Sequence, residues 1–155
     1  MQVDTGLEAG DRKKISDELA RAMADTYVLY LKTQGFHWNV TGDKFQPLHQ
    51  VFEDQYMDLR GAIDDLAERM RALGEYAPAS WAQFGEIASI REETGVPPAM
   101  EMVKQLVAGH EAVVKTLRSG IPTAEAANDE ATVDLMVERL RVHEKTAWML
   151  RSFLQ

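Results

Sequence analysis

The chain has no cysteine among its 155 residues. Disulfide bonds, thiolate metal sites and cysteine nucleophiles are therefore excluded. Long apolar runs are missing as well, and no segment approaches the roughly 20 apolar residues that a membrane-spanning helix needs. The N-terminal segment is too polar for a secretory signal. We therefore expect a single domain over residues 1–155, no membrane association and a cytoplasmic location.

Positive charge is scarce. The chain has 17 Lys and Arg against 25 Asp and Glu, and its net charge is -8. A surface of this sign attracts cations and repels nucleic acids. Apolar residues make up 45% of the chain, which is sufficient for a buried core. The composition is that of a globular protein that favours cations over nucleic acids as partners.

Apolar residues recur at steps of three and four along most of the chain, which is typical of helices that bury one face. Examples are Ile15, Leu19 and Met23 near the start of the chain. We expect four long helices with these ends: about Asp11 to near Phe36, about Lys44 to Leu73, Met100 to Gly120 or Pro122, and Asn128 or Asp129 to about Trp148. The glycine and the proline are expected to kink or end the third helix.

The connector between the second and third helices contains the segment SWAQFGEIASI, which fits one short helix. No alternation typical of strands and no sequence repeat is visible. The expected fold is therefore all-α, a four-helix bundle with a short helix in the connector. Residues 1–10 precede the first helix, and we expect them to form a short flexible tail.

A polar stripe lies beside the leucines of the second predicted helix. Its members at steps of three and four include His49, Glu53, Asp64 and Glu68. However, His49 and Glu68 are nineteen positions apart, which is roughly 28 Å along a helix. One metal ion cannot be shared across that distance, so a single chain offers at most two separate half-sites.

Pairing two copies of this helix antiparallel about a two-fold axis removes the difficulty. Residue numbers 49 and 68 have the same sum as 53 and 64, so one register brings His49 and Glu53 of one chain opposite Glu68 and Asp64 of the other. His37, just past the first predicted helix, can complete the shell. Imidazole and carboxylate ligands suit iron, zinc or manganese, and an oxygen-rich shell stabilises ferric iron. Oxidation of Fe(II) is the reaction that this ligand set favours.

Simpler interpretations of the same residues stay open. His37 alone fits a capping or core histidine, and Asp64 with Glu68 fits a solvated helix face. The whole stripe could merely seal a dimer, in which case replacing His49 would change assembly but no chemistry. Of the other two histidines, His110 fits a hydrogen-bonded core residue and His143 a packing or surface residue.

These motifs also resemble a known family. The segments FHWNVTG, LHQVFE and DDLAERMRALG, together with NDEATVDLM and HEKTAWML near the C-terminus, resemble the Dps family of ferritin-like DNA-binding proteins from starved cells. The resemblance covers nearly the whole chain. It implies a ferritin-like bundle, a hollow dodecamer built from two-fold dimers, and a ferroxidase centre at the two-fold interface. The implied iron ligands are His37, His49 and Glu53 of one chain and Asp64 and Glu68 of its neighbour. Many members of the family carry Asp where this chain has Glu53.

The resemblance also implies a function. Fe(II) is oxidised, with hydrogen peroxide or dioxygen as the oxidant, and is stored as ferric mineral, which protects against oxidative damage. Asp129, Glu130 and Asp134 would line a three-fold pore that admits iron, although helix capping is an alternative role for Asp129. Trp38 would lie near the iron site, either as a sink for oxidising equivalents or as an interface packing residue.

The family's binding of DNA is not expected to carry over. The segment before Arg12 holds Asp4 and Glu8 and no Lys or Arg, and the C-terminal RSFLQ adds no basic extension. Because the net charge is also negative, we expect DNA binding to be weak or absent. The alternative function is a nucleoid-associated or structural cage protein with a weak or vestigial metal site.

Overall fold

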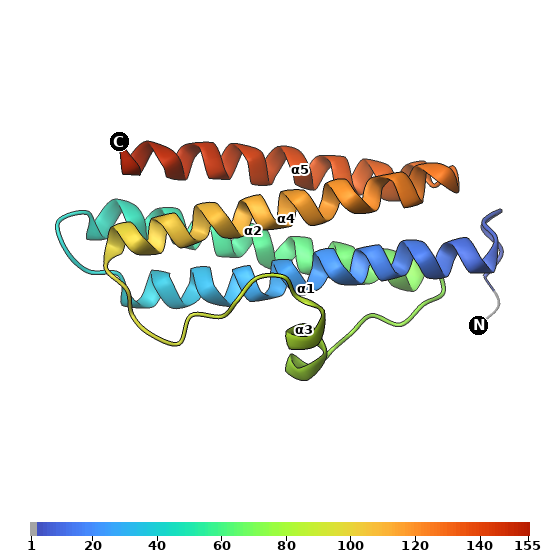
Figure 1. Cartoon of the computed structure of the whole chain (residues 1–155), viewed down its shortest axis with the longest axis horizontal. Coiled ribbons are helices and arrows are strands. Elements are labelled where there is room, and N and C mark those ends of the chain that lie inside the picture. Colours follow the sequence, from blue (N-terminus) through green and yellow to red (C-terminus); the bar gives the residue numbers. More distant parts are fainter. Residues whose placement is uncertain (1–2) are drawn as a thin grey trace.

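The computed structural model describes residues 3–155. Four long helices lie side by side, and a short helix packs beside them in the connector (Figure 1). The elements are α1 (Ala9–Asn39), α2 (Phe45–Ala72), α3 (Trp81–Ile87), α4 (Ala99–Ala126), α5 (Glu130–Arg151) and the 3-10 helix η1 (Ser152–Leu154). No strand occurs in the described residues, so the predicted all-α bundle with a connector helix is confirmed.

The long connector determines how the helices run. It carries the chain from the end of α2 back along the bundle, so that α2 and α4 run in the same direction while α1 and α5 run in the opposite direction (Figure 1). Asp25 of α1 fixes this connector. Its buried carboxylate accepts hydrogen bonds from the backbone N–H of Ser89 at 2.6 Å, from that of Ile90 at 3.3 Å and from the Thr116 hydroxyl at 2.6 Å.

The first helix begins earlier than expected. Ala9 and Gly10 are already helical, although the predicted flexible tail extends to residue 10. The first two residues of that tail lie outside the described part of the chain. Within the remainder, Leu7 packs partly buried against the core, and its carbonyl accepts a hydrogen bond from the Arg12 guanidinium.

The prediction that α4 could end at Gly120 or Pro122 is wrong, because the helix continues through both to Ala126. Gly120 is buried, and a Cβ added there would lie 3.0 Å from the Cβ of Glu18 and 3.3 Å from the Cε of Met136. The glycine therefore permits close packing of α4 against α1 and α5. Tertiary packing of this kind overrides the low helix propensity of glycine and proline.

The core is a row of large apolar side chains along the centre of the bundle. On α2 the buried residues include Phe52, Leu59 and Leu66, which are spaced by seven and are part of the hydrophobic core. Burying such side chains contributes about 1.5–3 kcal/mol each. Because this spacing places one face of α2 inside, the opposite face with its polar stripe is left on the outside of the chain.

A polar network joins α2, α4 and α5. The guanidinium of Arg139 donates to both carboxylate oxygens of Asp58, at 2.7 and 3.2 Å, and lies 3.4 Å from His143 Nε2. His143 Nδ1 is 2.8 Å from His110 Nδ1, so one imidazole donates to the other. Both histidines are buried, which confirms the hydrogen-bonded core role expected for His110 and gives His143 a packing role.

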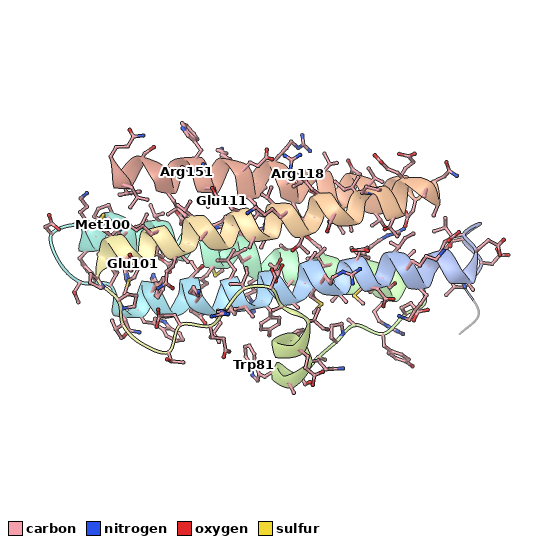
Figure 2. The ribbon with its side chains drawn as sticks, viewed as in Figure 1. Trp81, Met100, Glu101, Glu111, Arg118 and Arg151 are labelled. Atoms are coloured by element: carbon pink, nitrogen blue, oxygen red, sulfur yellow. The ribbon has the colours of Figure 1, made fainter. Side chains whose placement is uncertain are left out.

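Charged pairs also link α4 to α5 on the surface. Arg118 pairs with Glu144, and Arg151 pairs with Glu111; three of these four side chains are labelled in Figure 2. Exposed pairs of this kind contribute little to stability.

Within residues 3–155, no helix combines the length and the apolar character required to cross a membrane.

Candidate metal centre

The site is built at the corner where α1 ends and α2 begins. The Val40 N–H bonds to the carbonyl of Phe36, and Val40 then adopts an extended conformation that stops α1. Gly42 has a φ of 104°, which glycine adopts without the steric cost that a Cβ would add. This turn places the last turn of α1 beside the first turns of α2.

His37 and His49 face each other across this corner. His37 lies within the last turn of α1, so the expectation that it falls just past the helix is wrong. Its Nδ1 is 2.8 Å from the carbonyl oxygen of His49, and Nδ1 of His49 is 2.8 Å from the carbonyl oxygen of His37. The two rings stack with their centroids 3.8 Å apart and their planes at 19°.

These reciprocal hydrogen bonds set the tautomer of both rings. A carbonyl oxygen can only accept, so both Nδ1 atoms must carry the proton and donate it. In a neutral imidazole the proton is then absent from Nε2, which keeps a lone pair for a metal ion. Metal-binding histidines commonly donate their other ring N–H to a backbone carbonyl in this way. Both histidines are therefore prepared to bind a metal ion through Nε2.

The carboxylates are arranged differently from the histidines. Glu53 lies one turn after His49 and is half-buried, whereas Asp64 and Glu68 are exposed farther along α2. Across residues 3–155, no three His, Asp or Glu side chains lie close enough together to hold a metal ion. One chain thus brings the two histidines together and keeps Asp64 and Glu68 apart from them, and the two-chain site stays a prediction.

The outer face of α2 between these groups is open. Met57 is 51% exposed, and a Cβ added to Gly61 would have no neighbouring atom within 4 Å. Glycine inside a helix costs roughly 0.5–1 kcal/mol relative to alanine, and nothing in the chain's own packing requires it at this position. A second backbone approaching closely at Gly61 would explain the residue.

Comparisons with known proteins show the family to which this fold belongs. The ferritin-like domain family matches residues 16–155. The DNA protection during starvation protein of Brevibacillus brevis is 42% identical over 137 residues, which cover 88% of this chain and 92% of that protein. A Dps protein from Vibrio cholerae, described as a member of a broad superfamily of ferritin-like diiron-carboxylate proteins, has a TM-score of 0.94 at 32% identity, with 100% of this chain and 98% of that chain covered. The chain belongs to the Dps family.

The acidic residues at the start of α5, which the Dps resemblance assigns to a pore, divide into two kinds. Asp129 is buried and caps α5, accepting from the Thr132 N–H at 3.1 Å and from Arg69 at 2.7 Å. Burial would raise the pKa of Asp129, but the hydrogen bonds from Thr132 and Arg69 hold that pKa below its usual value. Glu130 and Asp134 are exposed. The capping role of Asp129 is confirmed, and the other two acids are free to attract cations.

Aromatic residues around the histidines complete this corner of the Dps fold. Phe45 packs on His49 with the ring centroids 5.1 Å apart, and Tyr56 meets His37 edge to face at 5.3 Å. Sequence reasoning did not single out either residue, although Tyr56 lies seven positions after His49 and thus on the same face of α2. Trp38 is 63% exposed, and its part in the site is untested.

Proposed function

We propose that the protein oxidises Fe(II) and stores the product as a ferric mineral, at sites that are each completed by two chains. The observation that carries this proposal is the His37–His49 pair, whose backbone hydrogen bonds leave both Nε2 atoms available to a metal ion. Membership of the Dps family supports iron as that metal, because a family member is described as a ferritin-like diiron-carboxylate protein.

The proposed ligand set joins two faces of a two-fold dimer. His37, His49 and Glu53 come from one chain, and Asp64 and Glu68 come from the second. The open outer face of α2 and the unexplained Gly61 support close pairing of two α2 helices. Six such dimers would form the hollow dodecamer that the Dps family implies, with Glu130 and Asp134 concentrating Fe(II) near its entry pores.

The ligands account for the reaction. Carboxylate oxygens stabilise Fe(III) more than Fe(II), so binding favours the loss of one electron from each iron ion. Two Fe(II) ions held together supply two electrons, which together with two protons reduce one hydrogen peroxide molecule to two water molecules, so no hydroxyl radical forms. The chain's own contribution is to fix the two imidazoles and to supply anionic oxygen ligands.

The first test measures Fe(II) oxidation after anaerobic loading and a peroxide pulse. The Asp64→Ala, Glu68→Ala double variant should assemble normally and lose fast oxidation, because each site loses both ligands from its second chain. The matched control is Asp65→Ala, which removes an exposed carboxylate of the same helix that is turned about 100° from Asp64 and lies outside the proposed ligand set. Equal, slow rates in all three proteins would favour the alternative of a structural or nucleoid-associated cage.

A complementation experiment tests whether each site is shared by two chains. His49→Ala and Glu68→Ala should each be inactive alone, since each removes one ligand from every site. A mixed dimer of the two variants retains one intact site, so random mixing after dissociation should restore about a quarter of the wild-type activity. Sites contained within single chains would gain nothing from mixing, and that outcome would refute the shared site.

A further inference from the structure

A continuous series of aromatic rings leads from the histidine pair to the protein surface. The ring centroids are 5.3 Å apart from His37 to Tyr56, 6.2 Å from Tyr56 to Tyr30, 5.9 Å from Tyr30 to Tyr27 and 5.2 Å from Tyr27 to Trp81. All four contacts are edge to face. The series crosses from α2 to α1 and ends on α3, where Figure 2 shows Trp81 at the edge of the molecule.

We propose that Tyr56, Tyr30, Tyr27 and Trp81 form a relay that carries single oxidising equivalents from the iron site to the surface. This inference rests on the proposed function, because iron oxidation supplies those equivalents. Phenol and indole side chains can be oxidised by one electron, and the oxidised ring can then take an electron from a neighbouring phenol or indole. Each ring of the series is in contact with the next, so no transfer has to cross a gap wider than one ring contact.

The chemistry of the rings distinguishes a relay from simple packing. Phe84 stacks on Tyr27 at 4.5 Å and 21°, which shows that phenylalanine fills space in the same cluster. The three rings of the relay inside the chain are tyrosines instead. All three tyrosines are partly exposed, and none of their hydroxyls is among the buried side-chain atoms of the described residues that lack a hydrogen-bond partner. The protons released on oxidation can therefore pass to water.

The oxidant is formed when a site holds only one iron ion. One Fe(II) then reduces hydrogen peroxide by a single electron, which gives Fe(III), hydroxide and a hydroxyl radical. That radical takes the phenolic hydrogen atom of Tyr56, and the products are water and a tyrosyl radical. The relay thus begins by converting a damaging radical into a confined one.

Each later step moves one electron toward the iron site. Tyr56 regains its electron from Tyr30 and a proton from water, while Tyr30 releases its own proton, and the same exchange follows between Tyr30 and Tyr27. Trp81 then supplies the electron to Tyr27 and loses the indole proton. Trp81 is 56% exposed, so a thiol in solution can return a hydrogen atom to it and end the sequence.

The relay is tested by interrupting it at Tyr30. Tyr30→Phe keeps the ring and removes the oxidisable hydroxyl, while Tyr76→Phe is the matched control because Tyr76 is 85% exposed and lies under Arg71, outside the series. Protein loaded with less than one Fe(II) per site receives peroxide in the presence of a nitroso spin trap. Adducts are located by peptide mass spectrometry, and Fe(III) formation is followed in parallel by absorbance.

The wild type and Tyr76→Phe should carry the adduct on Trp81, and Tyr30→Phe should lose it and carry the adduct on Tyr56 instead. Fe(II) oxidation should proceed at the same rate in all three proteins. Equal labelling of Trp81 with and without the Tyr30 hydroxyl would overturn the relay. A wild-type rate no faster than that of Asp64→Ala, Glu68→Ala would instead contradict the proposed function.

An iron-free measurement tests the relay independently of that function. In a Trp38→Phe, Trp148→Phe background, Trp81 is the remaining tryptophan, and azide radicals made by pulse radiolysis oxidise it. Electron exchange between adjacent rings is reversible, so the indolyl absorption should fall by a first-order process to an equilibrium level as tyrosyl absorption rises, and this exchange should be lost when Tyr27 is replaced by phenylalanine. An unchanged first-order exchange in Tyr27→Phe would overturn the assignment of Tyr27.

Discussion

Mild acid should destabilise each subunit through the buried His110–His143 pair. His110 is 2% exposed. Its pKa is lowered from 6.5 to about 3, mainly by burial; the positive charge of Arg139 also lowers this pKa, and the negative charge of Asp58 opposes the change. Burial also lowers the pKa of His143 well below 6.5, with the neighbouring His110 and Arg139 acting in the same direction. Both imidazoles therefore stay neutral in the folded chain under conditions where the unfolded chain protonates them.

The direction of the effect follows from proton binding. Between pH 6.5 and about 3 the unfolded chain holds a proton on His110 that the folded chain does not, so stability falls as the pH falls. Each pH unit of this difference corresponds to about 1.4 kcal/mol. At pH 5 the loss from His110 alone is thus about 2 kcal/mol relative to pH 7, and His143 adds to it.

The lowered pKa of Asp129 acts outside this interval. The stability that Asp129 contributes is present above its ordinary value of 3.8 and is lost only as the pH falls toward its lower folded pKa. The interval from pH 7 to pH 5 therefore isolates the histidines from this carboxylate. Denaturant unfolding at the two pH values, followed by far-UV circular dichroism at one chain concentration, measures the difference.

A variant separates the histidine pair from other titrating groups. His110→Leu, His143→Met should lose less stability than the wild type between pH 7 and pH 5, by at least the about 2 kcal/mol that His110 alone accounts for. If this variant folds poorly, an NMR titration of the wild-type imidazoles gives the same information, since His110 should stay neutral at pH 5. An imidazole of His110 that titrates near 6.5 in the folded protein would contradict this prediction.

Three further predictions concern assembly, the connector and DNA. Gly61→Leu should leave the helical content unchanged but prevent pairing of α2, and size-exclusion chromatography should show smaller species than the wild type; a normal assembly would contradict close approach at Gly61. Asp25→Ala should cost about 2–4 kcal/mol in denaturant unfolding, because buried donors of the connector and Thr116 lose a charged acceptor; a loss below about 1 kcal/mol would show that water replaces it. Gel shifts at physiological salt should show weak or no DNA binding, and tight stoichiometric complexes would contradict the argument from charge.

The sequence predicts the architecture well because the pattern of apolar residues is local. The seven-residue spacing of Phe52, Leu59 and Leu66 is enough to define α2 and its buried face. The error at Pro122 has the opposite origin. Whether a helix survives a proline depends on what packs around it, and the close contacts of Gly120 with Glu18 and Met136 involve distant parts of the chain.

The candidate site can be proposed from the sequence, but its local geometry cannot. The spacing of His49, Glu53, Asp64 and Glu68 is visible in the sequence, and so is their placement on one face of a helix. The hydrogen bonds between His37 and His49 depend on the backbone geometry of the turn at Gly42, which the spacing does not specify. The His110–His143 pair lies beyond local reasoning for the same reason, because it joins residues 33 positions apart on different helices.

The mutual hydrogen bonds of His37 and His49 couple the positions of the two residues. Each ring is held by the other residue's backbone carbonyl and stacks on the other ring, so each ring helps to fix the other at the corner between α1 and α2. Replacing one histidine therefore loosens the second, and the effects of the two single substitutions should overlap rather than add. For the proposed metal site the corner is therefore preorganised, and binding would cost little conformational entropy. Substitutions in the turn at Gly42 should consequently weaken metal binding although none of its side chains touches the metal.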